Sequence, residues 1–323
     1  MKFQRNLFLY LFFLLLTLLI AFWYMRTTNQ PVGVAEEYHR IAVNALNAGN
    51  NEEAVTYASY VIARQPDYGP AYTTRGLAYQ RMYKFDESIA DLNRAIELGT
   101  TDVYTYYTRG LAYHSQENFD KALQDLDYVI HLKPDYAVAY QARGIVYYDR
   151  GDSPRALDDL NTAIQLAPDD ADSYYGRALV YETMGQMDQA LADYSRAIEI
   201  NKTFGHAYYG RAFLYYELRD YEKAFSDVNL SIQYEPTNAD HFLLRGLIYD
   251  ARGDYARAAE DYGLAIDQNP RHEYAYYWRA IAYEALNKDT EAIRDFQKVL
   301  ELTDNVERRR DVEERLRAIE VAP

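Results

Sequence analysis

The chain has 323 residues, of which 49% are hydrophobic and 26% are charged, proportions that are ordinary for a folded protein. Its 34 basic and 49 acidic side chains give a net charge of −15, which argues against a nucleic-acid binder. Cysteine is absent, so disulfide scaffolds, thiol nucleophiles and cysteine-based metal sites are excluded. The 35 tyrosines are far more than an ordinary globular chain carries, and this excess indicates a repeated unit.

The first notable segment is the uncharged apolar run at residues 7–25. As a helix it would be about 28 Å long, close to the roughly 30 Å thickness of a bilayer's hydrocarbon core. We therefore predict that residues 1–26 form a signal-anchor transmembrane helix and that residues 27–34 form a linker. A cleaved signal peptide is the alternative, but the run is longer than usual and no suitable cleavage site follows it closely.

The charges that flank this run give its expected orientation. Lys2 and Arg5 precede it, whereas only Arg26 follows closely. The excess of positive charge on the N-terminal side favours a cytoplasmic N-terminus. We therefore expect a single-pass protein of the cytoplasmic membrane, with the rest of the chain outside the cytoplasm.

From Ala35 to Val306 the sequence consists of eight copies of a 34-residue unit without a gap. The eight repeats begin at residues 35, 69, 103, 137, 171, 205, 239 and 273, and positions are counted from these residues. Position 4 is aromatic, position 8 is Ala or Gly, and position 20 is Ala or Ser in every repeat. Position 11 is Tyr in all repeats except the first, and position 32 is Pro in five. So regular a pattern predicts one structural unit that is stacked eight times.

Each unit is predicted to be a pair of helices. Positions 4, 7, 8 and 11 have the spacing of one helical face, and positions 20, 24 and 27 form a second such face. Glycine at position 15 in four repeats is suited to a turn between the two helices. Proline at position 32 ends the second helix. One helix pair alone would leave its apolar face in water, so neighbouring pairs must stack.

The pattern resembles the tetratricopeptide repeat (TPR) family, and repeat 4 carries its motif at Tyr140, Gly144, Tyr147, Ala156, Leu160, Ala163 and Pro168. This resemblance implies an all-α, right-handed superhelix (α-solenoid) of antiparallel helix pairs, in which the first helices line a concave face. We assign residues 35–303 to eight repeats. Residues 304–323, which have one apolar stripe among charged residues, are predicted to be a C-terminal capping helix.

The sequence departs from the family pattern at two positions. Position 7, usually Leu in the family, is Arg in repeats 2–8, and position 23 is Asp in the same repeats. Repeat 1 lacks both, which favours ion pairs within a repeat because pairing between repeats would leave one residue of each kind alone. The predicted structural pairs are Arg75–Asp91, Arg109–Asp125, Arg143–Asp159, Arg177–Asp193, Arg211–Asp227, Arg245–Asp261 and Arg279–Asp295. A row of arginines that binds an anionic ligand is the alternative.

No pattern of catalytic chemistry is present. The six histidines show no metal-binding spacing, and no phosphate-binding glycine loop or nucleophile elbow occurs. The repeats and the predicted cap use up the chain after the linker. We therefore expect no enzyme activity, no catalytic residue, no metal and no cofactor.

The candidate site is the free stripe of the first helices, at positions 2, 5, 9, 12 and 13. In the TPR family this stripe lines the ligand groove. The predicted peptide-binding residues are Tyr107, Tyr148, Tyr175, Tyr209, Phe213, Tyr216, Tyr277, Asp149, Glu182, Glu217, Asp250 and Glu284. The stripe is acidic and lacks the Lys, Asn and Arg pattern with which some family members hold a C-terminal carboxylate. The alternative is that these side chains only pack against their neighbours.

We predict a membrane-anchored scaffold whose tyrosine-rich, acidic groove binds a protein or peptide with basic and aromatic or aliphatic character. The expected contact with the membrane is made by residues 7–25, and no nucleic acid is expected as a partner. The alternative function is an obligate non-catalytic subunit of a membrane enzyme complex or of a secretion or assembly machine.

Overall fold

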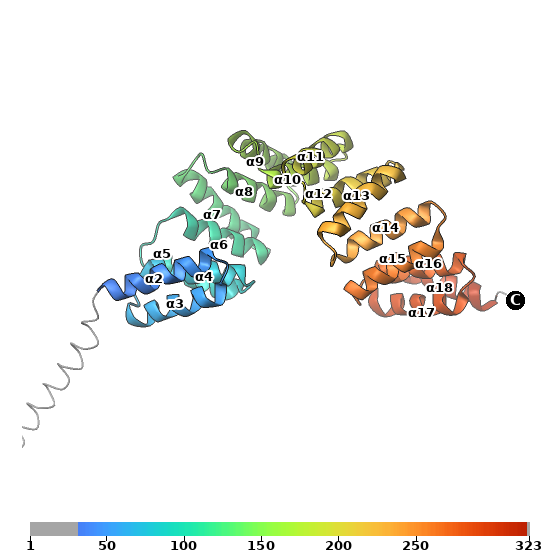
Figure 1. Ribbon diagram of the computed structural model, residues 1–323, viewed down its shortest axis with the longest axis horizontal. Helices are drawn as coiled ribbons and strands as arrows, with labels where there is room; N and C mark the ends of the chain where they lie inside the picture. The colour runs from blue at the N-terminus through green and yellow to red at the C-terminus, as the bar shows by residue number, and fades with distance from the viewer. Residues whose placement is uncertain (1–31, 322–323) are drawn as a thin grey trace, which may run out of the picture. The chain divides into compact units, whose positions relative to one another are not determined.

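The computed structural model describes residues 32–321, and the regular structure in this part of the chain consists of helices joined by short turns (Figure 1). The predicted anchor at residues 7–25 lies outside the described residues. The helices are α2 (Val32–Asn47), α3 (Asn51–Arg64), α4 (Gly69–Arg81), α5 (Phe85–Glu97), α6 (Val103–Ser115), α7 (Phe119–Leu132), α8 (Ala137–Asp149), α9 (Ser153–Leu166), α10 (Ala171–Thr183), α11 (Met187–Ile200), α12 (Gly205–Glu217), α13 (Tyr221–Tyr234), α14 (Ala239–Ala251), α15 (Tyr255–Gln268), α16 (Glu273–Ala285), α17 (Asp289–Leu302) and α18 (Val306–Val321).

Each repeat forms two packed helices joined by a short turn, from α2 and α3 in repeat 1 to α16 and α17 in repeat 8. Helix α2 already begins at Val32, so the last residues of the predicted linker are helical. Helix α18 lies within the segment predicted as the cap and packs on α17. The chain divides after Asp135 into unit 1, with α2–α7, and unit 2, with α8–α18.

The turn between the two helices of a repeat uses a left-handed backbone at position 15. Gly49, Gly151, Gly185 and Gly253 have φ between 72° and 85° there. In the other four repeats a larger residue adopts the same conformation, with φ between 55° and 60°, at Tyr83, Glu117, Arg219 and Asn287. Only glycine enters this region without steric cost. The turn is therefore imposed by the packing of the helices and not by glycine alone.

Small side chains bring the paired helices close together, as in repeat 5. Ala178 on α10 and Ala190 on α11 are fully buried, and Tyr194 fills the space beside them. In the repeats with proline at position 32, the second helix ends two residues before the proline. For example, α9 ends at Leu166, before Pro168. The proline disfavours helical geometry in the residue that precedes it.

The arginine at position 7 and the aspartate at position 23 form a bidentate pair in each of repeats 2–8. In repeat 5, Arg177 Nε donates to Asp193 Oδ2 at 2.7 Å and Nη2 donates to Oδ1 at 2.8 Å. Side chains of the seven aspartates are only 3–9% exposed and those of the arginines 17–21%. The aspartate charges are therefore buried and the arginine charges mostly so, and the bidentate geometry satisfies both carboxylate oxygens.

The same arginines also bind the preceding repeat, a contact that the sequence did not suggest. Nη1 of Arg177 donates to Asn161 Oδ1 at 2.6 Å, and Asn161 is at position 25 of repeat 4. The side-chain oxygen at position 25 of the preceding repeat accepts a hydrogen bond from arginine Nη1 in four further pairs, which are Arg75–Ser59, Arg109–Asn93, Arg211–Ser195 and Arg245–Asn229. Repeat 1 has no preceding repeat to which an arginine at position 7 could donate. This explains why that position is Ile41 there.

Aromatic rings flank each guanidinium group. In repeats 2–8 the ring at position 4 lies 5.5–5.8 Å from the arginine Cζ. In five of these repeats the tyrosine at position 11 lies on the other side, at 5.7–6.0 Å. At these distances an aromatic ring attracts a cation. Much of the tyrosine excess therefore surrounds the buried arginines.

No helix within residues 32–321 combines the length and the apolar character needed to cross a membrane.

We expect the Arg177–Asp193 pair to behave as one buried unit. Changing either residue alone to Leu leaves an uncompensated buried charge and should cost about 3 kcal/mol of the free energy of unfolding. The double variant should cost clearly less than the sum of the two single changes. Urea denaturation of the four proteins measures this coupling. Additive single and double effects would contradict the pairing, and Asn161→Ala should lose only about 1 kcal/mol.

Candidate functional site

The candidate site is the stripe of positions 2, 5, 9, 12 and 13 on the first helices of unit 2. Helix α8 contacts α10, α12 contacts α14, and α14 contacts α16, so the first helices in each of these pairs lie side by side. In α8, α10, α12, α14 and α16 these positions carry no Lys or Arg. They carry the acids Asp149, Asp172, Glu182, Glu217, Asp240, Asp250 and Glu284. At the same positions of unit 1, the only acidic or basic (Lys or Arg) side chains are Glu36 and Arg81. The acidic stripe therefore belongs to unit 2.

The tyrosines at position 5 pack on the following repeat instead of standing free. The ring of Tyr175 lies 5.1 Å from that of Phe204 and 5.9 Å from that of Tyr194, both in repeat 5, and 6.3 Å from the imidazole of His206 at the start of repeat 6. Burial is the main cause that raises the pKa of Tyr175 to about 12. The stripe was expected to be free, but position 5 faces the next helix pair and is half-buried there. These rings form the floor of the stripe.

Tyr209 has the same placement in repeat 6. Its ring stacks on the imidazole of His241, with centroids 4.8 Å apart and planes at 23°. His241 is 1% exposed, and neither of its ring nitrogens has a hydrogen-bond partner among the described residues. Burial lowers the pKa of His241, so this imidazole favours its neutral form. Removing the Tyr209 ring would therefore disturb the packing of repeats 6 and 7 as well as the stripe.

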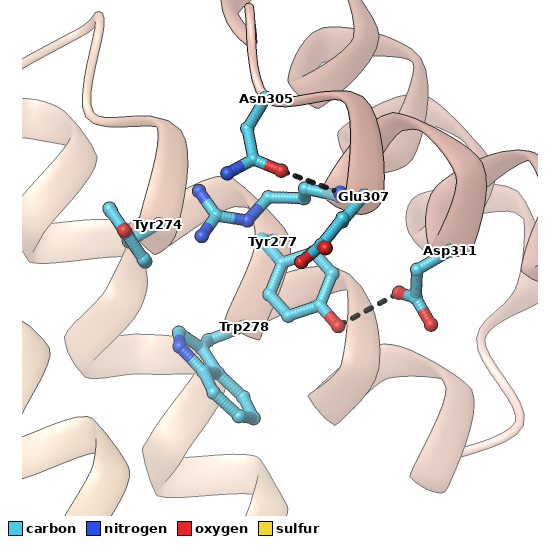
Figure 2. A pocket seen from close by; sticks show the side chains of 7 residues that line it. Tyr274, Tyr277, Trp278, Asn305, Glu307 and Asp311 are labelled. Carbon is cyan, nitrogen blue, oxygen red and sulfur yellow. Dashed lines mark hydrogen bonds between the residues drawn. The ribbon is translucent and has the colours of Figure 1, made fainter.

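At the C-terminal end, α18 covers the stripe of repeat 8 (Figure 2). The hydroxyl of Tyr277 donates to Asp311 Oδ2 at 2.8 Å. Arg308 Cζ lies 4.0 Å from the ring centroid of Tyr274, and Arg315 Nη1 donates to Glu284 Oε2 at 2.7 Å. Tyr277 and Glu284 are therefore already engaged by the cap. A cavity of about 310 Å³ remains here, lined by Tyr274, Tyr277, Trp278, Asn305, Glu307, Arg308 and Asp311.

The other predicted residues differ in exposure. Asp149 and Glu217 are exposed, whereas Tyr148, Phe213 and Tyr216 are half-buried. Phe213 packs against the cores of repeats 5 and 6, and the ring of Tyr216 lies 5.9 Å from that of Tyr221. Tyr107 is half-buried on α6 in unit 1 and is not part of the acidic stripe.

Two acids of the stripe are partly desolvated without a cation beside them. Glu182 accepts a hydrogen bond from the hydroxyl of Tyr194 at 2.7 Å, and burial raises the pKa of its carboxyl. Burial also raises the pKa of Asp250, for which no other cause operates. No ion pair involves either carboxylate among residues 32–321. The stripe therefore keeps negative charge in a partly buried place.

Sequence reasoning missed the tyrosines at position 24, Tyr194 and Tyr262. Both are fully buried, and both carry a hydroxyl where repeats 2–4 have Leu. A tyrosine at a buried helix position usually needs a partner for its hydroxyl. That substitution within an otherwise apolar position was the signal available in the sequence.

A polar recess of about 650 Å³ adjoins the stripe between repeats 6 and 7. His206 contacts Glu235 there, and His272 Nε2 lies 3.1 Å from Asp240 Oδ1. This contact is the main cause that lowers the pKa of Asp240. Among the described residues, no three His, Asp or Glu side chains are arranged to hold a metal ion.

Family models for the tetratricopeptide repeat match residues 73–137, 110–174, 171–204, 205–238 and 243–306. The chain belongs to the TPR family. These matches cover most of the predicted repeats, and the stripe lies on the first helices of the TPR units.

Solved TPR structures show the same fold. A tetratricopeptide repeat protein from Parabacteroides merdae matches with a TM-score of 0.60 at 20% identity, covering 79% of this chain and 98% of that one. A chain of the APC/C hetero-tetramer Cut9–Hcn1 matches with a TM-score of 0.67 at 12% identity, covering 82% of this chain and 52% of that one. No curated protein sequence matches this TPR chain significantly.

The raised pKa of Asp250 predicts a pH-dependent cost. The folded protein holds the Asp250 proton more tightly than the unfolded chain, whose aspartate pKa is 3.8. Ionised Asp250 therefore destabilises the fold above that pH, and protonation removes the cost. We expect Asp250→Asn to raise the urea midpoint at pH 7, with the gain shrinking toward about pH 3. Asp188→Asn, at an exposed site on α11, serves as the control. A gain for Asp250→Asn that does not change with pH would contradict the expectation.

Proposed function

We propose that this TPR protein is an interaction scaffold whose unit 2 binds a segment carrying Lys or Arg together with aromatic or aliphatic side chains. The observation that carries the proposal is the stripe of acids without a Lys or Arg on the first helices of unit 2. Glu182 and Asp250 are partly desolvated there without a cation. A basic ligand would supply the missing charge.

The cap supplies an example of this recognition within the chain. Arg308 lies over the Tyr274 ring and contacts Glu273, and Arg315 binds Glu284. An aromatic ring and a nearby carboxylate thus hold an arginine on a packed helix. Repeats 5 and 6 combine the same two kinds of side chain in Tyr175 with Glu182 and in Tyr216 with Glu217. This likeness supports a basic helical or extended segment as the ligand.

The two kinds of side chain would contribute differently to binding. Rigid aromatic rings such as Tyr148, Tyr175 and Tyr216 provide a large contact area at little entropic cost. Exposed acids such as Glu217 act at longer range and mainly increase the association rate. Salt screens this second contribution. Binding should therefore keep an apolar component when the electrostatic one is removed.

The proposal includes a membrane anchor formed by residues 7–25 and an extracytoplasmic position of the repeats. The length of the uncharged run and the basic residues Lys2 and Arg5 support both. An anchored scaffold would hold its basic partner at the membrane surface.

The ligand prediction is tested with the full chain in detergent and an array of acetylated, amidated 12-residue peptides. Peptides that combine Lys or Arg with aromatic or aliphatic residues should bind, and acidic peptides should not. For the tightest binder, Glu217→Lys should slow association several-fold, by about 1 kcal/mol in activation free energy, because it reverses an exposed charge of the stripe. Stopped-flow fluorescence at low and high salt measures the rate.

Glu260→Lys is the matched control, because it makes the same charge change at an exposed site on the second helix of repeat 7. Equal effects of Glu217→Lys and Glu260→Lys would show that only the net charge matters. An array that selects acidic or carboxylate-terminated peptides would contradict the proposal. A partner that stays bound through high salt would favour the obligate-subunit alternative.

The topology is tested by reporters fused after Pro323. Alkaline phosphatase should be active and green fluorescent protein dark, because only the phosphatase folds actively outside the cytoplasm. Sequencing of the mature N-terminus should find residue 1 or 2. Fluorescence without phosphatase activity would contradict the orientation, and an N-terminus near Glu36 would show a cleaved signal in place of the anchor.

A further inference from the structure

Repeats 5 and 7 share a pair of side chains that no other repeat has. Each has a tyrosine at position 24 on its second helix and an acid at position 12 on its first helix. The pairs are Tyr194 with Glu182 and Tyr262 with Asp250. Both tyrosines are fully buried, so each hydroxyl needs a partner within the protein or a bound ligand.

In repeat 5 this need is met. The hydroxyl of Tyr194 donates to Glu182 Oε2 at 2.7 Å. Tyr148, at position 12 of the preceding repeat, and Tyr175 are close enough to influence Tyr194 electrostatically. The hydrogen bond joins the core of the repeat to the acidic stripe and occupies the Glu182 carboxylate.

In repeat 7 the need is not met. The hydroxyl of Tyr262 is buried and has no hydrogen-bond partner among the described residues. Asp250, Tyr216 and Asp261 act on it electrostatically, and of these Asp261 is already paired with Arg245. Aspartate is one methylene shorter than glutamate, and no hydrogen bond joins the Asp250 carboxylate to the Tyr262 hydroxyl. The donor and the acceptor are left unjoined, and this unmade contact is called the gap below.

The ring of Tyr262 is held in this position from both sides. It belongs to a buried cluster against which Trp278 and Leu247 pack, and Gly246 leaves the space that the ring needs. A Cβ atom at Gly246 would lie 2.5 Å from Cε1 of Tyr262. The hydroxyl therefore cannot readily move to find another partner. Asp250 and Tyr216 are half-buried, so each is partly accessible from the stripe.

We propose that Asp250, Tyr262 and Tyr216 form a subsite for a primary alkylammonium group, the side-chain end of a lysine in the bound segment. The ammonium group donates one hydrogen bond to the Asp250 carboxylate and one to the oxygen of Tyr262. The face or hydroxyl of Tyr216 borders the third side. This subsite rests on the proposed function of unit 2, and it specifies which basic side chain one repeat recognises.

The physical reason is that one ligand group would remove two separate costs. A buried hydroxyl without a partner destabilises the folded protein, and so does a desolvated carboxylate without a cation. Each is tolerated in the free protein, and each is relieved when an ammonium group enters. Guanidinium is planar and larger, whereas ammonium is compact and has three donors, which suits two oxygens on neighbouring side chains.

Reciprocal substitutions test the subsite with the full chain. Asp250→Glu should let the carboxylate reach Tyr262, as in repeat 5, and so fill the gap. Glu182→Asp should open the equivalent gap beside Tyr194. Neither variant changes the net charge. Asp250→Glu adds one methylene, and Glu182→Asp removes one. The probe is n-butylammonium chloride, followed by the thermal midpoint against sodium chloride at equal ionic strength.

We expect n-butylammonium to raise the midpoint of the wild type, to have little effect on Asp250→Glu, and to have a larger effect on Glu182→Asp. Without the probe, Asp250→Glu should raise the midpoint, and Tyr262→Phe should abolish the response while retaining the fold. Equal responses of the wild type and Asp250→Glu would overturn the subsite.

A peptide measurement separates this inference from the proposed function. In the tightest peptide from the array, acetylation of one lysine should weaken binding to the wild type about tenfold and leave binding to Asp250→Glu unchanged. If the peptide binds but no lysine shows this difference, the subsite is wrong and the groove remains. If no basic peptide binds, the proposed function fails, and the n-butylammonium response still decides the subsite.

Discussion

The structure depends on a mostly buried arginine that pairs with an aspartate in each of repeats 2–8. At position 7, where the family usually has Leu, Arg177 gives two hydrogen bonds to Asp193 in its own repeat and one to Asn161 in the repeat before. Removing both charges from water is costly, and only complete hydrogen bonding compensates for this cost. The same side chain therefore joins the two helices of a repeat and joins that repeat to its neighbour. Gly263 at position 25 leaves Arg279 without the second link.

This arrangement separates stability from recognition within each first helix. Positions 4, 7 and 11 are occupied by the arginine and the rings that flank it, so the adjacent stripe is free to vary. In unit 2 it varies toward acids, although burial raises the pKa of Glu182 and Asp250. Side chains that are held at a cost to the folded state are typical of binding surfaces.

Repeats that look equivalent differ at the level of single atoms. Glu182 reaches the hydroxyl of Tyr194, whereas Asp250 does not reach that of Tyr262. The two acids differ by one methylene, and the hydrogen bond from the tyrosine hydroxyl is made in repeat 5 but not in repeat 7. The cap makes a similar distinction, because Arg315 occupies Glu284 while no cation occupies Asp250 in the described chain. Differences in single side chains at equivalent positions thus give the repeats different groups with which to bind a ligand.

The sequence by itself determined the helix pairs, their 34-residue period and the TPR fold, because helical periodicity and small residues at positions 8 and 20 are local constraints that recur eight times. It also pointed to a partnership between positions 7 and 23, through their joint absence from repeat 1. Only the tertiary structure decided the third arginine bond, the burial of Tyr175 and Tyr209 against the next repeat, and the covering of Tyr277 by α18. Each of these depends on how successive repeats face one another, and the spacing within one repeat does not contain that information.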